Sequence, residues 1–305
     1  MKTKNPLVAP VLKWVGGKRQ LFESFEPLFP KKLYQYTYCE PFFGGGAIFF
    51  KLQPGKAYIN DINEELMLVY RIIRDDVENL IDSLSIYKNN AETFYSIRDL
   101  DRDKEKFSRL SEVERAARII YLNKTCYNGL YRVNNAGEFN TPFGNYKNPN
   151  IMNEPTLRAV SQYLNSAKIT LTSCDYAEVL QNLKKKSFVY LDPPYDPISS
   201  TSNFTGYIRG GFNREEQTRL RDCCDDLTER GIKFMLSNSD TEFIRELYAA
   251  YNIIQVKAKR AVNSVASKRG DVNELVIRNY NFRQRSLFFS ERQRFSGGSC
   301  DKQSL

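Results

Sequence analysis

Short apolar runs alternate with amphipathic patterns along most of this chain. The runs have the length and the β-branched and aromatic content of buried strands, and they lie at residues 36–40, 57–61, 168–174, 187–192 and 232–238. Helical periodicity follows two of them, in "NEELMLVYRIIRDD" and "YAEVLQNL", and a charged amphipathic stretch at roughly 214–229 precedes the last. This alternation predicts an open α/β sheet with helices on its faces.

The pattern changes after residue 63, where helical periodicity dominates. "SEVERAARIIYLNK" begins with Ser111 and has Glu114 three residues later, which is the signature of a capping box at a helix N-terminus. Further on, "NNAG" between "LYRV" and "EFN" predicts a β-hairpin. We therefore expect a discontinuous α/β domain at 1–63 and 156–282, with a mainly helical insert and a projecting hairpin at 64–155.

The charge balance indicates an anionic partner. The 305 residues carry a formal net charge of +9, with a pI of about 9.1. Such an excess favours a polyanion, most often nucleic acid, although a solvated basic surface would give the same balance. Residues 283–305 hold five Arg or Lys and two acids, which is +3 of the total. Their weak periodicity predicts a basic, flexible tail.

The residue types that the chain lacks exclude several kinds of chemistry. There is no histidine, so Ser-His-Asp triads and histidine general bases are excluded. The six cysteines form no C-x-x-C pair, and we expect no metal site. No apolar run is long enough to span a bilayer, and "MKTKNPLVAPVLKW" at the start lacks the apolar region of a secretory signal. These features predict a cytoplasmic protein with no membrane partner.

Glycines and an acid follow the first two predicted strands. "CEPFFGGGAIFF" places three glycines between a strand and a helical run, which lets a ligand approach the backbone at the carboxyl end of a sheet strand. Asp61 ends the next strand, where an acid can hold ribose hydroxyls. Both features also have simpler explanations, because glycine clusters are often turns and Asp61 could cap the helix that follows.

The stretch "LDPPYDP", residues 191–197, directly follows the apolar run "SFVYL". Pro193 and Pro194 end a strand and restrict the backbone, so Asp192 and Tyr195 are held at its carboxyl end. The Asp192 carboxylate and the Pro193 carbonyl could accept both hydrogens of an exocyclic adenine amine, and Tyr195 could stack on the base. The simpler alternative is a proline-stiffened strand end with a surface acid.

Together, these motifs resemble those of DNA adenine N6-methyltransferases of the Dam and DpnM kind, the GATC-modifying branch. The resemblance covers about residues 11–281 and includes, in the family's order, "KWVGGK", "EPFFGGG", "NDIN", "YNGLYRVN", "GEFNTPFGNYKNP", "DPPYDPISSTSNFTGY" and "LSNSD". It implies a Rossmann-like, S-adenosylmethionine-dependent methyltransferase sheet with an inserted, mainly helical target-recognition domain.

The resemblance also implies roles for individual residues of the sheet domain. S-adenosylmethionine would be the methyl donor. The family's catalytic motif corresponds to Asp192, Pro193, Pro194 and Tyr195. The positions that match the family's donor site are Trp14, Lys18, Phe42, Gly44, Gly46, Asp61, Asp175, Tyr176 and Asp192.

For the insert, the resemblance implies contacts with double-stranded DNA. The matching positions are Lys13, Tyr127, Asn128, Leu130, Arg132 and Tyr146. Arg132 corresponds to a base-reading arginine, and arginine to guanine is the commonest specific contact in the major groove. Without the resemblance, this cluster is typical of an ordinary polar hairpin. Asn145 stands where the family commonly has arginine, which weakens the expectation of strict GATC recognition.

The leading hypothesis is a site-specific adenine N6-methyltransferase that acts on duplex DNA, expected at GATC, by base flipping. It would belong to a restriction–modification system, with a cognate endonuclease as genetic partner, or be a solitary Dam-like enzyme of a bacterium or phage. We expect a monomer or weak dimer. The alternatives are a catalytically inactive, sequence-specific DNA-binding protein of the same fold and a related methyltransferase that acts on RNA or another amine. The intact "DPPY" argues against the first, and the recognition segment against the second.

Overall fold

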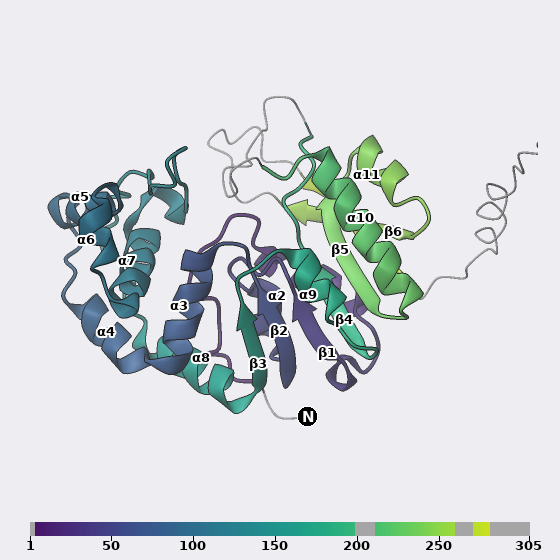
Figure 1. The fold of residues 1–305 in the computed structure, drawn as a ribbon, viewed down its shortest axis with the longest axis horizontal. Coiled ribbons are helices and arrows are strands. Elements are labelled where there is room, and N and C mark those ends of the chain that lie inside the picture. Colours follow the sequence, from purple (N-terminus) through teal and green to yellow (C-terminus); the bar gives the residue numbers. More distant parts are fainter. Residues whose placement is uncertain (1–3, 199–210, 260–270, 281–305) are drawn as a thin grey trace, which may run out of the picture.

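The computed structural model describes residues 4–198, 211–259 and 271–280. In this part of the chain, seven strands form one sheet in the order β3-β2-β1-β4-β5-β7-β6, at the centre of the molecule (Figure 1). The strands are β1 (Thr37–Glu40), β2 (Lys56–Asn60), β3 (Lys168–Thr172), β4 (Ser187–Leu191), β5 (Lys233–Ser239), β6 (Asn252–Lys259) and β7 (Asp271–Arg278). The first five run parallel, and β7 is antiparallel to β5 and β6.

The strand order changes direction between β1 and β4. β1 pairs with β2 on one side and with β4 on the other, so that Thr37 lies opposite Ser187 and Cys39 opposite Val189. In open α/β sheets, the connections that leave such a pair of strands diverge and create a crevice for ligands at the carboxyl ends. The glycine loop that follows β1 and the "DPPY" loop that follows β4 therefore leave the sheet at the same point.

Helices cover both faces of the sheet. Along β4, Phe188 and Tyr190 belong to one hydrophobic core, whereas Val189 and Leu191 belong to a second, because successive strand residues point to opposite faces. The first core includes residues of α1 (Phe22–Phe25), α2 (Ala47–Leu52), α3 (Glu64–Asp75), α4 (Val77–Ser85), α5 (Ala91–Arg98), α7 (Glu112–Thr125) and α8 (Glu154–Ser166). The second includes residues of α9 (Tyr176–Gln181), α10 (Arg214–Glu229) and α11 (Glu242–Leu247).

The helical insert lies beyond the β3 edge of the sheet, where α4, α5, α6 (Lys104–Ser108) and α7 gather (Figure 1). The expected capping box is present, because the Ser111 hydroxyl accepts the Glu114 N–H and the Glu114 carboxylate accepts the Ser111 N–H. The expected hairpin is also present. The N–H of Asn134 donates to the carbonyl of Glu138 at 2.9 Å, and an antiparallel bridge joins Val133 to Phe139.

A buried ion pair ties this hairpin to the insert helices. Arg118 in α7 and Asp101 approach to 2.7 Å, and their side chains are only 3% and 9% exposed. The same Asp101 oxygen accepts the N–H of Phe139 at 2.7 Å. Arg118 also donates to the carbonyls of Ile97 and Arg98. The pair therefore holds three segments of the insert together.

The five strands expected from apolar runs are confirmed to within two residues, and α10 has the predicted bounds. β6 and β7 were not predicted. The bounds proposed for the domains remain a prediction, since α3 packs on β3 of the sheet as well as on α7 of the insert. The predicted tail at 283–305 and the "STSNFTGY" part of the family motif from residue 199 on lie outside the described residues. In the described ranges, no helix is both long and apolar enough to cross a bilayer.

Replacing Arg118 by methionine should destabilise the protein strongly. The Asp101 carboxylate would then stay buried without its cation, and breaking a buried pair in this way costs about 3–5 kcal/mol. Urea denaturation followed by circular dichroism would measure the loss. Arg109→Met is the matched control, since Arg109 makes only an exposed pair with Glu105, and its unfolding midpoint should not change. An equal effect of both substitutions would contradict this account.

Candidate active site

Asp192 follows β4 directly and makes two close polar contacts. The Nζ atom of Lys18 lies 2.9 Å from Asp192 Oδ1, and the hydroxyl of Ser237 in β5 donates to the same oxygen at 2.9 Å. Lys18 is 4% exposed and also donates to the carbonyl of Gly16 at 2.7 Å. Within the described chain, no donor contacts Asp192 Oδ2. The acid is thus oriented through one oxygen, and the other remains available as an acceptor.

Tyr195 lies beside this ion pair. The Lys18 ammonium is 4.5 Å from the centre of the Tyr195 ring, and the phenol donates to Glu274 Oε2 in β7 at 2.9 Å. Burial raises the pKa of the Tyr195 phenol well above its usual value, and the carboxylates of Asp192 and Glu274 raise it further. The phenol therefore stays protonated and fixes the orientation of the ring through its hydrogen bond to Glu274.

The two proline carbonyls of the loop differ in their contacts. The side-chain amide of Gln217 in α10 donates to the carbonyl of Pro194 at 2.8 Å. Among the described residues, no donor reaches the carbonyl of Pro193. Gln217 therefore occupies the Pro194 carbonyl, whereas the carbonyl of the buried Pro193 has no donor within the described ranges.

The glycine loop is shaped by the aromatic residues against which it packs. A Cβ atom on Gly44 would lie 2.9 Å from the Trp14 ring, and one on Gly46 would lie 2.4 Å from the Phe43 ring. Both glycines also have positive φ angles, which side chains disfavour. Asp61 holds the loop to the end of β2, since its carboxylate accepts the N–H of Gly44 at 2.8 Å and that of Asn63 at 3.0 Å. Burial raises the pKa of Asp61, and these two hydrogen bonds oppose the shift.

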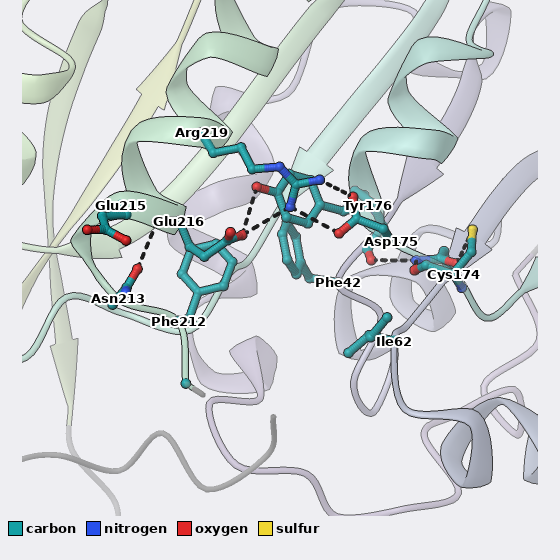
Figure 2. A pocket seen from close by; sticks show the side chains of 13 residues that line it. Phe42, Ile62, Cys174, Asp175, Tyr176, Phe212, Asn213, Glu215, Glu216 and Arg219 are labelled. Atoms are coloured by element: carbon teal, nitrogen blue, oxygen red, sulfur yellow. Dashed lines mark hydrogen bonds and ion pairs between the residues drawn. The ribbon is translucent and has the colours of Figure 1, made fainter. Parts of the chain in front are cut away.

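A cavity of about 360 Å³ opens beside the glycine loop (Figure 2). Phe42 comes from that loop, Ile62 follows β2, Tyr176 begins α9 and Phe212 precedes α10, and these four supply its apolar walls. Asp175 and Arg219 supply charge, with Arg219 4.8 Å from the centre of the Tyr176 ring. The cavity thus joins segments that follow β1, β2 and β3 to the start of α10.

Asp175 and Arg219 form a two-pronged ion pair at the wall of this cavity. The guanidinium donates to the two Asp175 oxygens at 3.0 and 2.6 Å, and to Glu216 at 3.2 Å (Figure 2). Burial alone would raise the pKa of Asp175, but the hydrogen bonds from Arg219 and from the N–H of Ala177 leave that pKa below its usual value. Asp175 therefore presents an ionised acceptor to a ligand.

The cavity suits an adenosyl group, which is the part of S-adenosylmethionine that carries a purine and a ribose. Its volume lies within the roughly 300–1,000 Å³ that is usual for small-molecule sites. The aromatic and aliphatic walls match a flat ring system, and the carboxylate of Asp175 can accept from an exocyclic amine. Asp61 lies between two residues that line the cavity, Asn60 and Ile62. Of the donor-site positions implied by the sequence, Phe42, Asp175 and Tyr176 line this cavity. The lining does not include Trp14, Lys18, Gly44, Gly46, Asp61 and Asp192.

The residues expected to contact DNA gather where the insert meets the N-terminal segment. The Asn123 side chain accepts the N–H of Lys13 at 2.9 Å and donates to the carbonyls of Lys13 and Gly129. Gly129 has a positive φ angle, and a Cβ atom there would lie 2.7 Å from the Lys13 side chain. Lys13 is therefore held directly against the turn that contains Tyr127 and Asn128 (Tyr127–Gly129).

Tyr146 supports this turn from the other side. Its hydroxyl accepts the N–H of Asn128 at 2.9 Å, and Asn128 has a left-handed backbone with φ of 56°. Tyr127 and Tyr146 are 53% and 41% exposed. The ring of Tyr127 is thus presented to solvent by a turn whose backbone is held in place, and the ring of Tyr146 is exposed next to it.

Arg132 and Leu130 extend the same surface along the hairpin. The exposed Arg132 donates to the side chain and the carbonyl of Asn140, at 2.7 and 3.2 Å. The carbonyl of Leu130 accepts the Thr141 hydroxyl at 2.6 Å. Trp14 connects the hairpin to the glycine loop, since its ring stacks on Tyr131 with the ring centres 5.0 Å apart. The two groups of predicted residues are therefore adjacent.

The sheet defines the class of protein. A glycine loop after β1, an acid after β2 and an acidic proline motif after β4, all at the switch point of a mainly parallel sheet, are those of a Rossmann-like methyltransferase. Comparison with known proteins identifies the family. The profile of D12 class N6 adenine-specific DNA methyltransferases matches residues 14–262. The chain belongs to this family, as its motifs suggested, and it is an adenine-specific DNA methyltransferase.

Curated relatives cover nearly the whole chain. It is 44% identical over 280 residues to the type II methyltransferase M1.LlaDCHI of Lactococcus lactis subsp. cremoris, covering 91% of this chain and 98% of that protein. It is 45% identical over 291 residues to the type II methyltransferase M.MjaIII of Methanocaldococcus jannaschii, covering 90% and 99%. The DNA adenine methylase of Escherichia coli is 35% identical over 270 residues, covering 87% and 93%.

Sequence reasoning did not find several residues of the site. Ser237 was inside the quoted string "LSNSD" but received no role. Glu274 lies on the unpredicted strand β7. Gln217 and Arg219 lie on the predicted helix α10, but helical periodicity alone does not show which of its polar residues face a site. Only the three-dimensional arrangement relates these residues to Asp192 and to the cavity.

Replacing Gly44 by alanine should weaken donor binding, because the added methyl group would collide with Trp14 and the left-handed backbone would be strained. We expect the affinity for S-adenosylhomocysteine, measured by calorimetry, to fall at least about 10-fold, which is 1.4 kcal/mol. Trp14 is the chain's single tryptophan, so its fluorescence would report the displacement directly. Gly55→Ala, where a Cβ atom meets nothing within 4 Å, should leave both signals unchanged.

Proposed function

We propose that the protein transfers the methyl group of S-adenosylmethionine to N6 of an adenine flipped out of duplex DNA, within the sequence GATC. The observation that carries the proposal is the arrangement of the Asp192 carboxylate, the Pro193 carbonyl and the Tyr195 ring at the switch point of the sheet. A cavity lined by residues that follow β1, β2 and β3 supports it, because that cavity fits an adenosyl group. Membership of a DNA adenine methyltransferase family supports the substrate class.

The two acceptors would increase the low nucleophilicity of the adenine amine. The lone pair of the adenine amine is delocalised into the ring, so the nitrogen is a poor nucleophile. If Asp192 Oδ2 and the Pro193 carbonyl each accept one amine hydrogen, the nitrogen becomes more tetrahedral and its lone pair becomes localised. S-adenosylmethionine supplies an electrophilic methyl group on sulfur. The protein contributes orientation and electrostatic stabilisation, and this requires no histidine.

We attribute extrusion of the target adenine to the exposed surface of the insert. Extruding an adenine costs a few kcal/mol of stacking and pairing. We infer that Tyr127 and Asn128 enter the duplex beside the extruded base and that Arg132, Leu130, Tyr146 and Lys13 contact neighbouring bases. Lys18 covers one face of Tyr195, so the flipped adenine would stack on the opposite face. Such a stack contributes about 1–3 kcal/mol.

The names of the relatives support a proposal for the biological setting. Two of them are named type II methyltransferases, a class that accompanies restriction endonucleases. On this basis we propose that the protein protects DNA against a cognate endonuclease encoded nearby. The relatives named DNA adenine methylases leave a solitary enzyme as the second candidate.

The direct test measures transfer of a labelled methyl group to GATC duplexes, scrambled duplexes and RNA of the same sequence. We expect adenine of the GATC duplex to be labelled and the RNA to remain unlabelled. Asp192→Ala should reduce the rate by about 10³-fold, as for the loss of other electrostatic catalytic groups, and should still bind duplex DNA. Asp82→Ala, an exposed acid on α4, is the control. Absence of label from all duplexes would overturn the proposal.

Replacing Arg132 by alanine should relax sequence discrimination more than it slows the reaction. Loss of an arginine that reads guanine costs about 1–3 kcal/mol at that base pair. The ratio of kcat/KM for GATC over single-base variants should therefore fall at one position only. Arg109→Ala, an exposed arginine of the insert, should leave the ratios unchanged. A uniform fall at every position would assign Arg132 to the phosphate backbone instead.

A further inference from the structure

We propose that Gln217 and Asn238 are positioning residues for methyl transfer. Gln217 occupies the Pro194 carbonyl, and together the two side chains hold the loop. The Pro193 carbonyl is then the one backbone acceptor of the loop that faces the target amine. The inference rests on the proposed function of this loop. It concerns two side chains on α10 and β5 that contact neither the donor cavity nor the exposed surface of the insert.

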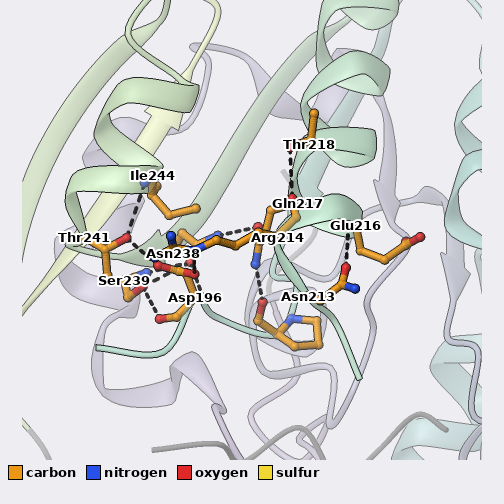
Figure 3. Close-up of polar contacts among 11 residues, drawn as sticks. Asp196, Asn213, Arg214, Glu216, Gln217, Thr218, Asn238, Ser239, Thr241 and Ile244 are labelled. Carbon is orange, nitrogen blue, oxygen red and sulfur yellow. Dashed lines mark hydrogen bonds and ion pairs between the residues drawn. The ribbon is translucent and has the colours of Figure 1, made fainter. Parts of the chain in front are cut away.

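The two amides form a directional chain of hydrogen bonds (Figure 3). Gln217 donates through Nε2 to the carbonyl of Pro194 at 2.8 Å, and its Oε1 accepts Nδ2 of Asn238 at 3.0 Å. Oδ1 of Asn238 accepts the N–H of Asp196 at 3.1 Å. Both amides are fully buried. This series of hydrogen bonds begins at Pro194 and ends at Asp196, both on the "DPPYDP" loop, so it closes a ring of contacts around Tyr195.

Asp196 fixes the far end of the loop. Its carbonyl accepts the Ser239 hydroxyl at 2.6 Å, and its carboxylate accepts the Thr241 hydroxyl at 2.8 Å and Nε of Arg214 at 3.3 Å (Figure 3). The Asp196 side chain is only 1% exposed, whereas its partner Arg214 is 65% exposed. Side chains at the end of β5, before α11 and in the first turn of α10 thus hold Asp196, the residue that follows Tyr195, in place.

These contacts restrict the direction in which the Pro193 carbonyl points. The rings of Pro193 and Pro194 fix their φ angles, so the ψ angles are the main rotations left to this part of the loop. Strand β4 holds the backbone before Asp192, and Gln217 holds the peptide plane that follows Pro194. The Pro193 carbonyl lies between these two anchors and accepts no hydrogen bond from the described residues, so we assign it as the acceptor for substrate.

Both positions of this hydrogen-bond chain, 217 and 238, require an amide side chain. An amide donates through nitrogen while it accepts through oxygen, whereas a carboxylate only accepts. Glutamate at position 217 would place an oxygen against the Pro194 carbonyl, and aspartate at 238 could not donate to Gln217. This requirement gives a function to the asparagine of "LSNSD", the string in which Ser237 already orients Asp192.

The test compares Gln217→Glu and Gln217→Met with the wild-type protein in single-turnover methylation of a GATC duplex. Both substitutions preserve the approximate size of the side chain and remove the donor to Pro194. Gln162→Glu, at an exposed position of α8, is the matched control for the change in charge. Donor affinity would be measured by calorimetry with S-adenosylhomocysteine, duplex affinity by fluorescence anisotropy, and the unfolding midpoint by circular dichroism.

We expect the single-turnover rate to fall about 10-fold to 100-fold in the position-217 variants, as when a reacting group is displaced by about 1 Å, while both affinities stay unchanged. An unchanged rate in a folded Gln217→Met protein would overturn the inference. Parallel losses of rate, both affinities and stability would also overturn it, because they would assign Gln217 a purely structural role. Wild-type protein that labels no duplex would refute the proposed function itself, which distinguishes the two failures.

Discussion

The pairing of β1 with β4 is the constraint on which the rest of this structure depends. The two strands are separated by more than a hundred residues of chain, yet they lie side by side with Thr37 opposite Ser187. This register brings the glycine loop and the "DPPY" loop out of the sheet at one point. The helical insert leaves the sheet after β2 and returns before β3, so it does not interrupt this pairing.

The segment at residues 13–18 contacts the turn of the insert, the glycine loop and the acid after β4. Lys13 lies against the Tyr127–Gly129 turn, Trp14 packs between the glycine loop and Tyr131, and Lys18 pairs with Asp192. Helix α10 plays a similar part on the other side, since consecutive residues of its first turns reach both the cavity and the catalytic loop. A few contacts therefore connect the Tyr127–Gly129 turn, the glycine loop and Asp192.

The sequence predicted the parallel part of the fold because its buried strands are continuous apolar runs. β6 and β7 escaped notice because their partners are antiparallel and polar residues such as Gln255, Lys257 and Glu274 interrupt them. At the site, Asp192, Asp61 and the glycines could be predicted because they follow strands directly. Gln217, Arg219 and Glu274 could not, since their roles depend on which helix face and which strand neighbour the sheet assembles.

The left-handed turn at Asn128 has a consequence for the encounter with DNA. Its backbone is held by the Tyr146 hydroxyl, and Lys13 packs over the adjacent Gly129. Ordering a loop on binding costs about 1–2 kcal/mol of conformational entropy per residue. If Tyr127 enters the duplex as proposed, these contacts already hold the backbone that carries it, and they reduce this part of the cost.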